Sequence, residues 1–537
     1  MVVIKDSKNN VADNIGNTYY NKLYDYSKII GYSVEEDNEL KIEFNPDRPD
    51  LFSFFALKES MKIFYDNNYR IKGILNSSSI KIIPDRSILR ERPYLLSFTA
   101  EGKPIGNNLQ HIIDYQERLH DIIGKNRKKV SIGIHDLDNV KPPFRYTMVE
   151  AKTLKFTTYD NYTGNAYDIL NKHEKGREYK DLIKSVTKVP VIFDSENDVM
   201  SMPPVINGIK SKVTDKTSKF FFDITGTDFN AVRSAFYLFA YEMSYTGYKI
   251  SVCDSGSNED YNVSNYDFRE IYINEKEIKS LMGTVPDDVV TLLRKMGYRC
   301  EVSDYGYRIN VPGNRIDVMG PVDIIEDVAK AYGYDNINEK KLKIYNAGKP
   351  DKKNDNISVI RDILTSVNYQ EIRTFVLTSN EFYNRLNYSG EVSLENPKSM
   401  DYSMIRDRLY PGMLNFIKIN KRNGLPVKIF EIGDIIKSGK QHTDLCIIYN
   451  NTKAVYSDIY QILNYLNTRS IDKKITVMEK KHDEIIEGRG GNINIGDDTV
   501  GFMGEMSPDI LSNFEIMAPI SFLEINLDKF LSYLNKN

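Results

Sequence analysis

The chain of 537 residues contains no tryptophan and only three cysteines, Cys253, Cys300 and Cys446, which lie far apart in the sequence. They form no Cys-x-x-Cys pair, so neither a disulfide framework nor a structural zinc site is expected. The six histidines are scattered and form no His-Glu-x-x-His motif. This usage argues against structural zinc and favours a reducing compartment.

Long apolar runs and an excess of positive charge are also missing. No segment approaches the roughly eighteen apolar residues that a membrane span needs, and the first residues, MVVIKDSKNN, lack the apolar core of a signal peptide. We therefore expect a cytoplasmic protein without membrane contact. With 72 basic and 75 acidic residues the net charge is −3, so any contact with RNA has to come from local patches or a partner.

The length and the alternation of helical and strand patterns predict an α+β protein of about three or four domains. The clearest linker is the polar, charged segment 348–356. The predicted domains are an N-terminal α/β domain (1–90), a second α/β domain with a basic lead-in (91–270), a small domain of helices and a hairpin (271–345), and a C-terminal domain (350–537).

Four carboxylates lie within eleven residues of the small domain. Asp317 belongs to a run that alternates like a strand, whereas Asp323, Glu326 and Asp327 begin an amphipathic helix. Residues three and four apart share a helix face, and no Lys or Arg lies on that turn, so these acids repel one another unless a cation bridges them. An all-oxygen set favours Mg²⁺ over Zn²⁺. The alternative is that the acids interact with the positive end of the helix dipole.

The same string resembles a known family. Its R-x-D element, followed by D-x-x-E-(E/D)-V-A-x-x-Y-G-Y, is similar to the small domain of the beta subunit of phenylalanyl-tRNA synthetase in its archaeal and eukaryotic form. Segments along the whole chain carry the resemblance, among them NPDRPDLFS, RKKVSIGIHDLD, MPPVING, FFDITGTD and KIFEIGD. It implies that Asp317, Asp323, Glu326 and Asp327 bind Mg²⁺, which orders the small domain without chemistry of its own.

The resemblance also implies a proofreading site. In this family, the domain that matches 151–270 hydrolyses tRNA(Phe) charged with tyrosine, because a mostly apolar pocket cannot strongly reject an isostere that only adds a hydroxyl. Such a site needs a polar group for the phenol and a positioned water near the ester. The residues carried over to this pocket are Asp223, Thr225, Ser201 and Asn207.

Two polar segments of this domain have alternative interpretations. The resemblance implies phosphate contacts with tRNA for the basic run with Lys125, Arg127, Lys128 and Lys129, although such a run is often a solvated turn. The segment from Thr225 to Asp228 contributes to the pocket or caps the helix that follows, with Asp228 as the N-cap.

The C-terminal domain resembles a class II synthetase fold, an antiparallel sheet with flanking helices that does no aminoacylation in the beta subunit. The residues agree, because class II chemistry needs an Arg in a G-x-G-x-x-R motif and GFMGEMSPDIL supplies glycines without it. Arg406 and Arg408 remain, in a context that indicates a structural role.

The resemblance therefore implies a scaffold and editing subunit that pairs with an alpha chain in an (αβ)₂ heterotetramer. The complex uses ATP and Mg²⁺ to charge tRNA(Phe). Two alternatives stay open. One is a structural, tRNA-binding subunit with an inactive editing pocket. The other is a metal-dependent hydrolase centred on Asp317 and Asp323, against which the lack of a nearby His or Lys as general base counts.

Overall fold

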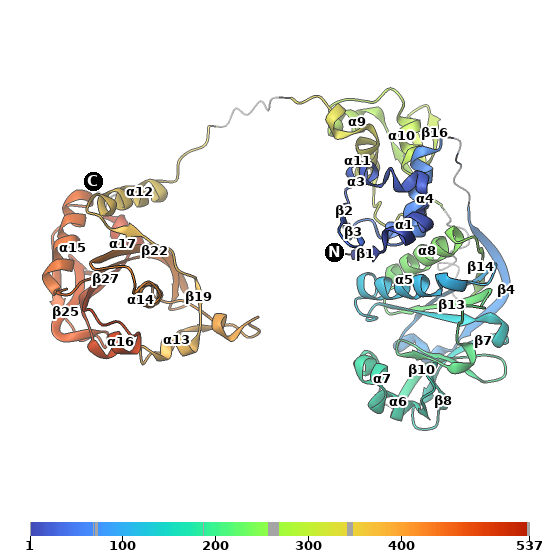
Figure 1. Ribbon diagram of the computed structural model, residues 1–537, viewed down its shortest axis with the longest axis horizontal. Helices are drawn as coiled ribbons and strands as arrows, with labels where there is room; N and C mark the ends of the chain where they lie inside the picture. The colour runs from blue at the N-terminus through green and yellow to red at the C-terminus, as the bar shows by residue number, and fades with distance from the viewer. Residues whose placement is uncertain are drawn as a thin grey trace. The chain divides into compact units, whose positions relative to one another are not determined.

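The computed structural model describes residues 2–533 apart from 68, 70–72, 186, 256–267 and 341–346. The chain forms two compact units, Met1–Lys341 and Leu342–Asn537, which are described separately (Figure 1). Both units combine sheets and helices, in agreement with the predicted mixed α and β architecture. Among the residues described, no helix is both long and apolar enough to span a membrane.

The first unit begins with a small sheet covered by helices. Its strands are β1 (Val2–Asp6), β2 (Ser33–Glu36) and β3 (Leu40–Phe44), paired antiparallel in the order β1-β3-β2. The helices are α1 (Lys8–Ile15), α2 (Asn17–Tyr20), α3 (Leu23–Ile30) and α4 (Phe54–Tyr65). The alternation of β3 buries Leu40, Ile42 and Phe44 on one face. Ser53 caps α4, since its Oγ accepts a hydrogen bond from the Ala56 amide at 3.0 Å.

A nine-stranded sheet forms the middle of this unit, in the order β12-β11-β10-β7-β4-β14-β5-β13-β6. Its strands are β4 (Leu75–Pro84), β5 (Tyr94–Glu101), β6 (Val130–Asp136), β7 (Phe144–Glu150), β10 (Lys188–Phe193), β11 (Val199–Met202), β12 (Ile206–Asn207), β13 (Lys219–Gly226) and β14 (Lys249–Asp254). The long strand β4 pairs in parallel with both β14 and β7, and so joins the two halves of the sheet. This strand lies before residue 91, where the second domain was predicted to begin.

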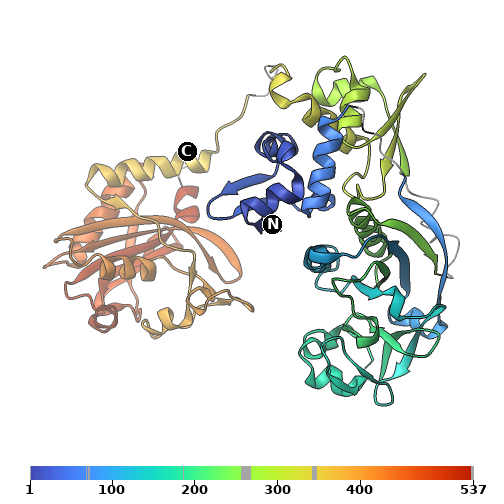
Figure 2. The ribbon, with the colours of Figure 1, turned by 45° about the vertical axis from the view of Figure 1, so that its right-hand side comes forward.

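Helices α5 (Leu109–Ile122) and α8 (Phe229–Tyr245) lie side by side over one face of this sheet (Figure 2). Strand β13 turns Phe220 and Phe222 toward the core beneath these helices. Because side chains alternate along a strand, Asp223 and Thr225 point to the opposite face. Asp228 caps α8 through the Ala231 amide at 3.2 Å, as predicted. The excursion between β7 and β10 holds β8 (Lys155–Thr157), β9 (Thr163–Asn165), α6 (Ala166–Lys172) and α7 (Glu174–Tyr179).

A three-stranded sheet and three helices complete the first unit. They are β15 (Phe268–Ile273), β16 (Arg299–Ser303), β17 (Gly306–Pro312), α9 (Glu275–Met282), α10 (Val289–Lys295) and α11 (Pro321–Tyr332). Their buried side chains join one core with the N-terminal module and the large sheet. Strand β17 ends at Pro312, so Asp317 lies in a turn. The prediction that Asp317 belongs to a strand was wrong, because Pro312 and Gly313 interrupt the alternating run.

The second unit is an antiparallel sheet between two layers of helices, with one parallel edge strand. The sheet order is β18-β22-β23-β27-β26-β25-β24, formed by β18 (Gln370–Glu371), β22 (Val427–Lys437), β23 (Lys440–Asn450), β24 (Ile475–Glu479), β25 (Ile485–Ile495), β26 (Asp498–Met506) and β27 (Ile520–Asn526). One core holds side chains of α12 (Lys352–Ser366), α15 (Tyr456–Ser470) and α17 (Leu527–Ser532). The other holds side chains of α14 (Tyr410–Ile419) and α16 (Pro508–Asn513).

The remaining elements of this unit are short: α13 (Asn380–Asn384) and a small sheet of β19 (Leu377–Thr378), β20 (Val392–Ser393) and β21 (Met404–Ile405). The predicted linker 348–356 extends too far, because α12 already begins at Lys352. Asp351 caps this helix by accepting a hydrogen bond from the Lys353 amide at 2.9 Å. A polar first turn precedes the apolar face of the helix, and composition alone does not distinguish such a turn from a linker.

Candidate active site

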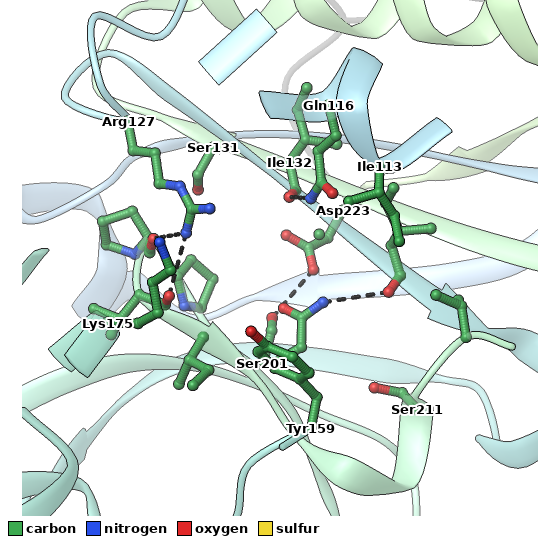
Figure 3. A pocket seen from close by; sticks show the side chains of 18 of the residues that line it. Ile113, Gln116, Arg127, Ser131, Ile132, Tyr159, Lys175, Ser201, Ser211 and Asp223 are labelled. Atoms are coloured by element: carbon green, nitrogen blue, oxygen red, sulfur yellow. Dashed lines mark hydrogen bonds between the residues drawn. The ribbon is translucent and has the colours of Figure 1, made fainter. Parts of the chain in front are cut away.

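A cavity of about 580 Å³ lies beside the edge strand β6, between helix α5 and the loop that joins β11 to β12 (Figure 3). The two edge strands of the large sheet, β6 and β12, approach each other at this cavity. Asn207 on β12 donates a hydrogen bond from Nδ2 to the carbonyl oxygen of Ile134 on β6 at 3.2 Å. Three of the four predicted pocket residues, Asp223, Ser201 and Asn207, line this cavity.

The acid at the base of the cavity is held by groups from two other strands. Asp223 is only 1% exposed, and its Oδ2 accepts a hydrogen bond from Ser201 Oγ at 3.1 Å. The same oxygen lies 2.7 Å from Nε2 of His135 on β6. Nδ1 of His135 lies 2.8 Å from Ser211 Oγ. A chain of buried polar groups thus runs from Ser211 through His135 to the carboxylate.

Gly133 provides the space that this carboxylate occupies. It pairs with Asp223 across strands β6 and β13. A Cβ atom on Gly133 would lie 2.2 Å from Asp223 Oδ2 and 2.8 Å from His135 Nε2, closer than atoms can approach. The absence of a side chain at this position is therefore a condition for the acid to lie here.

We expect Gly133→Ala to lower the free energy of unfolding by about 1–3 kcal/mol, because the added methyl group displaces two buried, hydrogen-bonded side chains. Urea denaturation followed by circular dichroism measures the change. Gly348→Ala is the control, since a Cβ there meets no atom of the described residues within 4 Å. Equal stability of the two variants would contradict the steric argument.

Thr225, the fourth predicted residue, lies beneath the cavity wall. It is fully buried, and its Oγ1 accepts a hydrogen bond from Arg92 Nε at 3.0 Å. Arg92 also donates from Nη2 to Ser131 Oγ at 3.1 Å, and Ser131 lines the cavity. Burial lowers the pKa of the Arg92 guanidinium to about 10. Thr225 therefore links a buried cation to the cavity wall.

Of the four basic residues that follow α5, one lines the cavity and three do not. Arg127 lines the cavity, donates to the carbonyl oxygens of Pro204 and Val205 at 3.2 Å each, and lies over the ring of Tyr179 at 4.5 Å. Its guanidinium thereby holds separate parts of the cavity wall together. Lys129 forms an ion pair with Asp228 at 2.6 Å. The other two lysines of the run, Lys125 and Lys128, do not line the cavity.

Three of the four carboxylates of the small domain have cationic partners, contrary to the prediction. Arg315 donates from Nη2 to Asp317 Oδ2 at 2.8 Å and to Asp327 Oδ2 at 2.5 Å. Asp323 accepts hydrogen bonds from two backbone amides just before α11. Glu326 pairs with Lys330, one helical turn away, at 3.0 Å.

These contacts do not fit a magnesium ion as the four acids now lie. Among the residues described, no three of the four carboxylates bring their oxygens within 4.8 Å of one another. Arg315 occupies the position between two of the acids that a cation would take. The arrangement of the four acids gives no support to magnesium binding, which stays a prediction for these residues.

Three acids that were not predicted to form a site do lie together. The carboxylates of Asp194, Glu196 and Asp198 come within 4.8 Å of one another after β10. Lys210 Nζ lies 3.1 Å from Asp194 and 3.0 Å from Glu196, and it also contacts Asp198. Lys141 also pairs with Glu196, so two lysines offset part of the negative charge of the three acids.

In the second unit, Arg406 and Arg408 are held by acids, in agreement with a structural role. Arg406 donates from Nη1 to Glu431 at 2.6 Å, and both side chains are buried. Arg408 donates from Nη1 to Glu484 at 2.7 Å and lies over the ring of Tyr388 at 3.8 Å. Both guanidinium groups thus pair with carboxylates of this unit.

Comparison with known proteins identifies the family. Three family models match this chain: the B3/4 domain over residues 111–241, the tRNA synthetase B5 domain over 271–334, and the phenylalanyl tRNA synthetase beta chain CLM domain over 337–527. The phenylalanine–tRNA ligase beta subunit of Thermoplasma volcanium is 41% identical over 99% of both chains. The chain belongs to the phenylalanine–tRNA ligase beta subunit family. The beta subunit of Thermoplasma acidophilum is 38% identical over 98% of both chains.

A solved structure of this family covers the first unit. It is an N-terminal fragment of the phenylalanyl-tRNA synthetase beta subunit from Pyrococcus horikoshii, 31% identical, with a TM-score of 0.56. The match covers 62% of this chain and all of the fragment. The family predicted from the sequence is thus confirmed.

The family models place the two candidate sites in different modules. The acid at the base of the cavity and its partners on β6 and β11 lie inside the B3/4 match, and the carboxylates around Arg315 lie inside the B5 match. Four residues that shape the cavity or hold its acid were not predicted from the sequence: Arg92, Gly133, His135 and Ser211. The alternation of VSIGIHD puts Gly133 and His135 on one strand face, so a signal was present.

Proposed function

We propose that this chain is the proofreading and scaffold subunit of phenylalanine–tRNA ligase, and that its cavity hydrolyses tyrosyl-tRNA(Phe). One observation carries the proposal. Asp223 presents a carboxylate to a cavity between apolar walls, and only its Oδ2 has hydrogen-bond partners among the residues described. Its Oδ1 is left to accept a hydrogen bond from a ligand.

This arrangement suits a phenol. The apolar lining residues are Leu109, Ile113, Ile132, Ile134, Val205, Ile206 and Val213. A tyrosine ring fills such a space, and its hydroxyl donates to Asp223 Oδ1. A phenylalanine ring leaves the carboxylate without that partner, and a site built to bond a hydroxyl strongly disfavours the analogue that lacks it.

The reaction requires a water molecule and no covalent intermediate. Water attacks the carbonyl carbon of the tyrosyl ester, the bond to the terminal ribose oxygen breaks, and tyrosine and free tRNA(Phe) leave. The chain supplies the pocket that holds the ring and fixes the ester in place.

The remaining roles belong to the complex. We propose that the chain pairs with alpha chains in an (αβ)₂ heterotetramer, which uses ATP and Mg²⁺ to charge tRNA(Phe) in the cytoplasm. The engagement of Arg406 and Arg408 by acids supports a scaffold role for the second unit. Lys125 and Lys128 are the proposed phosphate contacts of the basic run. Three free cysteines agree with a reducing compartment.

The test is hydrolysis of tyrosyl-tRNA(Phe) by the reconstituted alpha–beta complex. We expect Asp223→Ala to lower the rate at least about tenfold, the value of one hydrogen bond to a charged group, while charging with phenylalanine is unchanged. Asp215→Ala, an exposed acid of the same domain, is the control. A wild-type complex without hydrolysis would leave the alternative, a structural and tRNA-binding subunit with an inactive pocket.

A further inference from the structure

We infer that His135 is a positioning residue of this pocket, which fixes the Asp223 carboxylate so that Oδ1 faces the tyrosyl hydroxyl. The inference rests on the proposed function and adds a determinant of its specificity. His135 is fully buried and does not line the cavity. Any effect it has on a ligand therefore passes through Asp223.

The hydrogen-bond chemistry shows how the imidazole acts. An ionised carboxylate only accepts hydrogen bonds, so Nε2 carries the hydrogen in its 2.7 Å contact with Asp223 Oδ2. Nδ1 lies 2.8 Å from Ser211 Oγ, whose hydroxyl also lies 3.2 Å from the Met200 carbonyl oxygen. This contact at the second ring nitrogen fixes the orientation of the imidazole.

Two donors from different strands fix the carboxylate. Oδ2 receives hydrogen bonds from His135 on β6 and from Ser201 on β11. The terminal torsion of an aspartate is broad, so a carboxylate without such anchors samples many orientations. With both anchors in place, only Oδ1 remains for the ligand. Because Gly133 has no side chain, the anchored carboxylate has the space that it occupies.

Selectivity between two analogues separates positioning from stability. The probes are 3′-(tyrosylamino)-3′-deoxyadenosine and its phenylalanyl counterpart, in which an amide replaces the scissile ester. Calorimetric titration of the full chain with each gives the ratio of their Kd values. We expect wild type to bind the tyrosyl probe about 10- to 100-fold more tightly, as one hydrogen bond to a charged group predicts.

His135→Leu removes the donor and is expected to bring the ratio close to 1. His135→Gln, whose amide can donate to Asp223 and accept from Ser211, is expected to keep most of the selectivity. Ser211→Ala removes the contact at the other ring nitrogen. Its ratio of Kd values is expected to lie between those of the two His135 variants. His173→Gln is the control, because it disrupts a His–Asp pair outside the cavity lining, 2.9 Å from Asp160.

Each result supports or overturns the inference. A ratio that falls in His135→Leu and is retained in His135→Gln supports positioning. A variant that binds both probes more weakly, with the wild-type ratio unchanged, shows that His135 only stabilises the fold and overturns it. A wild-type ratio near 1 overturns the proposed function and, with it, the role of His135. If His135→Leu does not fold, the ratios of Ser211→Ala and His135→Gln decide.

Discussion

Replacing Arg315 by alanine is expected to lower the free energy of unfolding of the first unit by about 3–5 kcal/mol, the effect of removing one partner from a buried ion pair. Arg315 is 4% exposed and joins Asp317 and Asp327 through one guanidinium. Its Nη1 also donates to the carbonyl oxygen of Met296 at 3.1 Å. The hydroxyl of Tyr298 donates to Asp327 Oδ2 at 2.5 Å, so the truncation disrupts a connected network.

The comparison that identifies the cause uses three variants. Arg308→Ala removes an arginine that is 41% exposed from the same small domain, and is expected to change the free energy of unfolding far less than Arg315→Ala. Arg315→Lys keeps the charge but loses the planar guanidinium with its several donors. Its loss of stability should lie between those of Arg315→Ala and Arg308→Ala. Urea denaturation followed by near-ultraviolet circular dichroism reports the unfolding. A loss in Arg315→Ala no larger than that in Arg308→Ala would show that the network contributes little.

The same network shows where sequence reasoning about the acids fell short. Periodicity correctly predicted that Asp323, Glu326 and Asp327 begin a helix. The neutralising cations were missed for two reasons. Arg315 lies in the turn before the helix, outside any helical spacing, and Lys330 lies one turn further along than the residues that were considered. Repulsion between neighbouring acids therefore does not by itself predict a bound metal ion, because a basic residue from another element can neutralise them.

Secondary structure was easier to predict from the sequence than the pairing between strands. The amphipathic helix that holds Asp323, Glu326 and Asp327 lies where it was predicted, because apolar periodicity is a local signal. The nine-stranded sheet was not predicted, since it joins strands from residue 75 to residue 254 in an order that the sequence does not state. Long-range pairing depends on packing between distant segments.

The cavity illustrates the same limit. Family resemblance suggested Asp223, Ser201 and Asn207, and the structure brings them to one cavity. His135 was missed because its partner strand lies more than eighty residues away, as the separation of His135 and Asp223 shows. Alternation along β6 gives the face of the histidine, but only the register between β6 and β13 shows which acid it meets.

A second large effect is expected at Glu242, a fully buried acid on α8. Its Oε2 accepts a hydrogen bond from Ser53 Oγ at 2.6 Å, while its Oε1 has no partner within the part of the chain that the structure describes. Burial raises the pKa of this carboxyl from 4.5 to about 7. A raised pKa in the folded state means that the associated stability is present below pH 4.5 and is lost as the pH rises through 7. The loss amounts to about 3 kcal/mol above pH 7.

Glu242→Gln tests this directly, because a neutral amide keeps an acceptor for Ser53 and cannot ionise. We expect the two proteins to be about equally stable at pH 4.5 and the variant to be about 3 kcal/mol more stable at pH 8. His120, whose pKa burial lowers to about 4, titrates in the opposite sense in both proteins and cancels in their difference. Glu174→Gln, an exposed acid on α7, is the control. A stability difference that does not change between pH 4.5 and 8 would show that Glu242 is ionised in the folded chain throughout this range, with a partner that compensates its burial.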